Sequence, residues 1–131
     1  MSLFNQNSAQ ILLTVFFIIT YFVSVVEKLV DWKGTVAYYK DHFKNTFLLK
    51  LIPVLLIKVV VIEIVTLLFL FIGIYFLLSN GDFELAKTGL IFSAITLLVF
   101  LLGQRIAKDY PGAMNITVYF ILNIIGIYLL T

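Results

Sequence analysis

The sequence predicts an all-α integral membrane protein, a four-helix bundle with a short amphipathic interfacial helix between the first and second transmembrane helices. Two observations predict this class. The 131 residues are 63% hydrophobic and 12% charged, whereas soluble domains are about 45–50% apolar. Four apolar runs also have the length that spans a hydrocarbon core of about 30 Å, which takes about 20 residues. Because lipid offers backbone groups no hydrogen-bond partners, each run must be a helix.

The four apolar runs lie within a single expected domain that covers residues 1–131. We expect the spans at residues 11–26, 53–78, 85–102 and 113–130. The turn-forming sequence Ser-Asn-Gly-Asp separates the second span from the third. Pro111 follows Asp109-Tyr110 and is placed to begin the fourth helix. Both connections are short, so consecutive helices should be antiparallel neighbours.

The first connection has an amphipathic pattern over residues 32–47. Large apolar residues recur there at helical spacings of four, three, four and four: Trp32, Val36, Tyr39, Phe43 and Phe47. Asp31 could cap the start of a helix, and Trp and Tyr favour the headgroup region. We therefore expect a short helix in the membrane interface, across the mouth of the bundle. The alternative is an irregular loop held down by its aromatic side chains.

The distribution of Lys and Arg predicts the orientation. Seven of them belong to the first and third connections: Lys28, Lys33, Lys40, Lys44, Lys50, Arg105 and Lys108. The opposite side has Lys87 and the α-amino group. The positive-inside rule therefore places the first and third connections in the cytoplasm and both termini outside. Residues 1–10 contain no Lys or Arg, so we expect no cleaved signal peptide and a first span that stays in the mature protein.

The composition excludes several classes of chemistry. The chain has no cysteine and one histidine, which leaves no dithiol, thiolate metal site or iron–sulfur cluster, and too few ligands for zinc. No phosphate-binding loop, HExxH or GxSxG motif occurs. The net charge of +2 without a dense basic run argues against nucleic acid as a partner. We therefore predict no catalytic residues, no metal and no covalent cofactor.

Glu63 is the most informative residue because it lies near the middle of the second span. At 1.5 Å per residue it is about 4 Å from the midplane, where a charge costs roughly 2.5–3.5 kcal/mol. It must face the bundle interior, be protonated or have a partner. Lys58 lies about 140° away around the same helix and can snorkel to the membrane edge. Lys28 and Arg105 are therefore the better counter-charges.

The other spans each have a polar stripe, which predicts a polar vestibule open toward the interfacial segment. The candidate residues of this intramembrane site are Glu63, Lys28, Glu27, Arg105, Gln104, Asp109, Tyr21, Tyr119 and Asn115. The alternative is structural: Ser, Thr and Asn side chains often only join neighbouring membrane helices, and glycines only permit close packing.

Two stretches resemble the DoxX family. They are SVVEKLVDWKGTVAYYKDHF at residues 24–43 and GQRIAKDYPGAMNITVYF at residues 103–120, with Glu63 between them. The resemblance covers nearly the whole chain and implies a four-helix bundle in a bacterial inner membrane. It also implies a loosely defined function, since some relatives are subunits of quinone-linked sulfur or thiol oxidation complexes and distant ones are assembly chaperones. The fold resembles that of vitamin K epoxide reductase as well, whose cysteines are absent here.

Together these features favour an accessory membrane subunit with a membrane protein partner and a quinone or other lipid in the vestibule. In this hypothesis Glu63 accepts a quinol proton, and Tyr21 or Tyr119 donates a hydrogen bond to a quinone carbonyl. A second hypothesis is a non-catalytic scaffold or assembly factor for a larger membrane complex. A third is a small proton-coupled transporter that works as a homo-oligomer. In each case the lipid bilayer is the surrounding partner.

Overall fold

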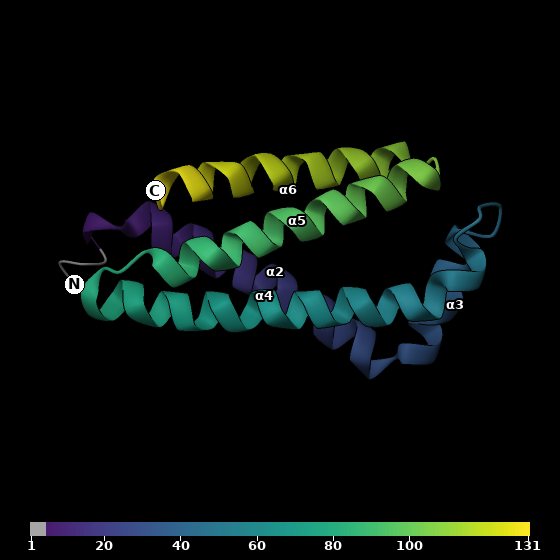
Figure 1. The fold of residues 1–131 in the computed structure, drawn as a ribbon, viewed down its shortest axis with the longest axis horizontal. Helices are drawn as coiled ribbons and strands as arrows, with labels where there is room; N and C mark the ends of the chain where they lie inside the picture. Colours follow the sequence, from purple (N-terminus) through teal and green to yellow (C-terminus); the bar gives the residue numbers. More distant parts are fainter. Residues whose placement is uncertain (1–4) are drawn as a thin grey trace.

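The computed structural model describes residues 5–131 of the chain (Figure 1). The expectation of an uncleaved N-terminus rests partly on residues 1–4, which lie outside the described residues. The helical elements are α2 (Ser8–Val30), α3 (Trp32–His42), the short 3₁₀ helix η1 (Leu49–Leu51), α4 (Ile52–Asn80), α5 (Glu84–Ile106) and α6 (Tyr110–Leu129). Over residues 5–131 there is no strand, and four helices are long and apolar enough to cross a membrane. The predicted fold class is confirmed.

The four long helices run along the long axis of the molecule (Figure 1). The start of α2 and the end of α6 lie at one end of the bundle, and α3 and the α5–α6 connection lie at the other. Helix α4 packs against both α2 and α5, and α5 also packs against α6. With 29 residues against 23, α4 is longer than α2. Figure 1 shows α3 extending from the end of α2 toward the start of α4.

Side chains and backbone conformation set the helix boundaries. The Asp31 carboxylate accepts a hydrogen bond from Gly34 N at the start of α3 (3.0 Å). Asp109 does the same for Gly112 N at the start of α6 (2.9 Å). These bonds satisfy amide groups that have no partner within the helix. Helix α4 ends at Asn80 and is followed by Gly81, whose φ of 73° lies in the left-handed region that glycine adopts without steric cost.

Helices α4 and α5 come closest near the turn that joins them. A Cβ built on Gly73 would lie 2.5 Å from Ala86 Cα, so only glycine permits this approach of the two backbones. A Cβ on Gly89 would likewise lie 2.8 Å from a Leu70 side-chain carbon. From this tight contact α5 crosses at an angle and lies near α6 at its other end (Figure 1). The two helices therefore separate toward the start of α4.

The interfacial helix is shorter than predicted, and the expectation that it includes Phe47 is wrong. Helix α3 ends at His42, because Thr46 donates from both its backbone N (3.0 Å) and its hydroxyl (2.9 Å) to Phe43 O. This turn replaces the next helical turn and leaves Phe47 76% exposed outside the helix. The first part of the predicted face is present. Trp32, Val36 and Tyr39 pack against a cluster made by Phe43, Ile52 and Leu56.

Candidate functional site

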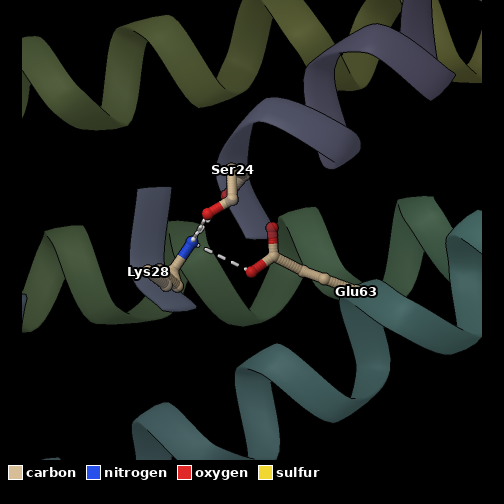
Figure 2. Close-up of polar contacts among 3 residues, drawn as sticks. All are labelled: Ser24, Lys28 and Glu63. Atoms are coloured by element: carbon tan, nitrogen blue, oxygen red, sulfur yellow. Dashed lines mark hydrogen bonds and ion pairs between the residues drawn. The ribbon is translucent and has the colours of Figure 1, made fainter. Parts of the chain in front are cut away.

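A buried ion pair joins the end of α2 to the middle of α4 (Figure 2). Lys28 Nζ lies 3.0 Å from Glu63 Oε1. The side chain of Glu63 is fully buried and that of Lys28 is 11% exposed. Lys28 Nζ also donates to Ser24 Oγ at 2.5 Å, one helical turn earlier. Of the two expected counter-charges, Lys28 is the one that makes the contact.

Helix periodicity places these side chains. Ser24 and Lys28 are four residues apart and share one face of α2, on which Tyr21 and Val25 are also buried. On α4, Glu63 and Thr66 share the buried face. Lys28 lies in the last turn of α2, where the free carbonyl groups of a helix favour a positive charge. The ion pair therefore has support from the helix end as well as from Ser24.

Glu63 has unused capacity to accept hydrogen bonds. Its contact with Lys28 is an ion pair without hydrogen-bond geometry, and neither carboxylate oxygen has a hydrogen-bond partner among the described residues. The nearby Thr66 hydroxyl donates to Ile62 O in its own helix (2.8 Å). The Thr96 hydroxyl similarly donates to Phe92 O (2.9 Å). A buried carboxylate with a single partner is costly, and such sites are candidates for function.

A polar pocket of about 350 Å³ lies between the end of α2 and α3. Its lining residues are Glu27, Lys28, Asp31, Gly34, Thr35, Tyr38 and Tyr39. Lys28 therefore contributes to both the pocket and the buried pair. Burial raises the pKa of the Tyr39 phenol, and the neighbouring Tyr38, Glu63 and Glu27 add to this rise. Tyr39 thus remains a neutral hydrogen-bond donor at physiological pH.

A second buried polar cluster connects three helices. The Tyr21 hydroxyl of α2 lies 2.7 Å from Ser93 Oγ of α5. Asn123 of α6 bonds the same oxygen at 2.5 Å, with its amide nitrogen donating to Leu90 O (2.9 Å) and its amide oxygen accepting from Ala94 N (3.3 Å). Every polar group in this cluster has a partner, so the expectation that Tyr21 offers its hydroxyl to a ligand does not fit this arrangement.

Two α6 residues of the predicted site, Asn115 and Tyr119, do not face the centre of the bundle. Asn115 is exposed on the outer surface, and Tyr119 is half-buried with its ring 6.0 Å from that of Phe16. Successive steps of four residues rotate by about 40° around a helix, so Asn115 lies about 80° from the buried Asn123. The polar stripe on α6 therefore turns away from the bundle. The expectation that Asn115 and Tyr119 line a central vestibule is wrong for this reason.

The remaining candidates form a separate cluster at the same end of the bundle. His42 Nε2 of α3 lies 3.1 Å from Gln104 Oε1 and 3.4 Å from Asp109 Oδ2. Arg105 is exposed, with its guanidinium 5.4 Å from the Tyr110 ring centroid. The contacts of His42 tie α3 to the α5–α6 connection. Neither these residues nor Arg105 line the polar pocket. The expected vestibule between all four helices is instead a pocket between α2 and α3.

Comparison of the chain with family models, with curated proteins and with solved structures found no match. Within residues 5–131, no three His, Asp or Glu side chains lie close enough together to hold a metal ion. The polar pocket and the buried pair are therefore the features of residues 5–131 that bear on function.

Proposed function

We propose that this chain is a DoxX-like accessory membrane subunit that binds the neutral head of a quinone in the α2–α3 pocket and presents it to a membrane protein partner. The observation that carries the proposal is the Lys28–Glu63 pair, buried inside the bundle with Lys28 on the pocket wall. An ionisable pair inside the membrane and next to a pocket is a candidate for function, because burying the two charges costs free energy.

The residues present fit the head of a quinone. Carbonyl oxygens need donors, and the Lys28 ammonium and the Tyr39 hydroxyl supply them from two helices. A reduced, hydroxyl-bearing head needs an acceptor, and the Glu27 carboxylate on the pocket wall supplies one. When bound, a quinone supplies two-electron redox chemistry. In this proposal Lys28 and Tyr39 orient the head, and Glu63 holds the Lys28 side chain in position.

The charges of the pocket favour a neutral head over an anionic lipid headgroup. Glu27 and Asp31 line the pocket together with Lys28, so carboxylates outnumber the ammonium group. An incoming phosphate would be repelled by both carboxylates. The volume of about 350 Å³ lies within the range of roughly 300–1,000 Å³ of small-molecule sites. A flat uncharged ring therefore suits this pocket better than a phosphate.

The proposed location is a bacterial inner membrane with the first and third connections in the cytoplasm. Figure 1 supports placing these two connections on one side, because α3 and the α5–α6 connection lie at the same end of the bundle. His42 of the first connection contacts Gln104 and Asp109, which lie at and next to the third connection. In this orientation the polar pocket opens toward the cytoplasmic interface, where a partner could receive electrons or protons.

The test measures quinone binding directly. We would purify the protein in mild detergent from its own membrane, quantify extractable quinone, and then titrate a short-chain quinone. We expect co-purified quinone and saturable binding. Tyr39→Phe removes one donor and should weaken binding about fivefold, the effect of losing a hydrogen bond worth about 1 kcal/mol. Tyr110→Phe, outside the pocket, should bind like wild type. Absence of both co-purified quinone and saturable binding would refute the proposal.

A second candidate function is a scaffold or assembly factor, and one observation favours it. The Tyr21–Ser93–Asn123 cluster is satisfied entirely within the protein, which is the arrangement expected of residues that only set helix packing. In this case Glu63 would also act in packing. Crosslinking in native membranes distinguishes the candidates. A Glu63→Gln variant that loses stability, keeps its crosslinked partner and supports full activity of the complex would favour the scaffold.

A further inference from the structure

A second surface feature lies on the outer face of the bundle, between α4 and α5. It is a groove of about 340 Å³ lined by Ile57, Lys58, Val61, Ile62, Val65 and Phe92. Five of the six residues are apolar, as expected of a surface that faces lipid chains. The groove shares no lining residue with the polar pocket between α2 and α3. It is therefore a separate site.

Lys58 is the unusual member of this surface. It is exposed within a membrane-spanning helix, and no acidic side chain lies within ion-pair distance among residues 5–131. The expected centre of the span is seven to eight residues further along α4, so the Lys58 backbone lies about 11 Å from the midplane. Its long side chain can carry the ammonium group to the headgroup level. Lys58 therefore offers an unpaired positive charge where lipid phosphates lie.

The shape of the groove follows from the helix crossing. Gly73 and Ala86 hold α4 and α5 in close contact near their shared turn, and the helices separate toward the start of α4 (Figure 1). The Phe69 and Phe92 rings stack with centroids 5.2 Å apart and bridge the two helices where the separation begins. From Lys58 to Val65 the groove extends about 10 Å along α4. It is thus an apolar groove with Lys58 toward its membrane-edge end.

We propose that this groove binds one anionic phospholipid, with its phosphate on Lys58 and one acyl chain along Val61, Val65 and Phe92. The charge and the apolar lining match the two parts of such a lipid. An anionic headgroup is favoured because a basic residue near the membrane surface attracts it. A zwitterionic lipid provides the same acyl chain without the net charge. The groove therefore selects among bilayer lipids through Lys58.

A second copy of the chain fits the groove less well than a lipid. In a two-fold symmetric dimer that uses this face, the same patch meets itself, so the like charges of two Lys58 side chains would approach one another. Six residues line the groove, whereas a standard interface has about 20–30 residues on each partner. These two features favour a lipid as the occupant.

The experiment compares lipid retention in defined bilayers. The full-length protein would be reconstituted into nanodiscs with equal amounts of phosphatidylglycerol and phosphatidylcholine, and the lipids that stay bound would be counted by native mass spectrometry. Wild type should retain one phosphatidylglycerol in preference to phosphatidylcholine. Lys58→Gln should retain about fivefold less, the effect of one basic residue at an anionic surface. Lys50→Gln, the same charge change at an exposed position outside the groove, should match wild type.

A second variant tests the acyl-chain site separately from the charge. Val61 is 55% exposed, so Val61→Trp should fold, fill the groove and reduce retention while Lys58 is intact. Equal retention in wild type and Lys58→Gln would overturn the proposal. Undiminished retention in Val61→Trp would show that the groove does not seat the chain and would also overturn it. A homodimer that excludes lipid and is lost in Val61→Trp would assign the groove to a second copy instead.

Discussion

Lys28 and Glu63 form an ion pair between α2 and α4 in which Lys28 has a second polar partner, Ser24, and Glu63 has none among the described residues. Lys28 Nζ contacts both Glu63 Oε1 and Ser24 Oγ, and its side chain reaches the polar pocket. Glu63 is fully buried, and Lys28 is its only polar partner among the described residues. The stability of the buried carboxylate therefore depends on Lys28 more than Lys28 depends on Glu63.

The first prediction follows from this asymmetry. Lys28→Met leaves a buried carboxylate without a counter-charge and should lower the free energy of unfolding by about 3–5 kcal/mol. Glu63→Gln should cost less, because Lys28 keeps Ser24 and access to the pocket. The double variant should recover much of the loss. Unfolding in mixed detergent micelles measures all three, with the exposed Lys33→Met as the control. Additive effects of the two single changes would contradict the ion pair.

The second prediction concerns the two asparagines of α6. Asn123 is fully buried and bonded to α5, so Asn123→Ala should destabilise the protein by about 1–2 kcal/mol. Asn115→Ala, on the exposed face of the same helix, should change stability by less than about 0.5 kcal/mol. The same unfolding assay measures both. An equal loss of unfolding free energy in the two variants would mean that both asparagines face the bundle.

The third prediction concerns helix packing at Gly73. Any Cβ there would overlap the backbone of Ala86, so Gly73→Ala should separate α4 from α5 and cost about 1–3 kcal/mol. Gly103→Ala is the matched control, since a Cβ at that position would meet only Phe43, at an ordinary 3.6 Å. Thermal unfolding in detergent compares the two variants. A stable Gly73→Ala protein would show that the α4–α5 contact is looser than described.

The fold could be predicted from the sequence because it depends on local properties. Apolar length located all four spans, and the capping residue Asp31, Pro111 and the turn at Gly81 marked helix ends that the structure contains. Phe47 was misplaced because the pattern continues at helical spacing, whereas Thr46 closes a turn through two hydrogen bonds to Phe43 O. Spacing alone does not reveal that competing bond.

The candidate site was harder to predict because it depends on how helices rotate and cross. Charge and depth singled out Glu63 and reduced its partners to Lys28 and Arg105, but only the crossing of α2 and α4 determines which one reaches it. Repetition every four residues suggested that Asn115 faces inward, although the stripe drifts around the helix. The contact of His42 with Gln104 and Asp109 joins distant segments, and no spacing in the sequence indicates it.

The fourth prediction tests the contact between α3 and the α5–α6 connection. The chain has no cysteine, so introduced cysteines are the only thiols. His42→Cys combined with Gln104→Cys should crosslink efficiently with a short bifunctional maleimide, because the native side chains are 3.1 Å apart. His42→Cys combined with Tyr128→Cys, at the opposite end of α6, should not crosslink within one chain. Gel mobility and mass spectrometry distinguish the products. Absence of the first crosslink would place α3 away from α5.

The fifth prediction is the pH response of Tyr39. Burial raises the pKa of this phenol above its ordinary value of 10.0, so the folded state disfavours the phenolate. The contribution of Tyr39 to stability should therefore be complete below about pH 10 and be lost as the pH rises through its higher folded-state pKa. Phenolate absorbance during an alkaline titration follows the ionisation of Tyr39 that causes this loss, and Tyr39→Phe should remove an absorbance component with a midpoint above pH 10. Tyr128→Phe, which removes an 80% exposed tyrosine, should leave that component in place. A difference between wild type and Tyr39→Phe with its midpoint at or below 10 would mean that water reaches the phenol, and that α3 does not enclose the pocket as the packing of Tyr39 indicates.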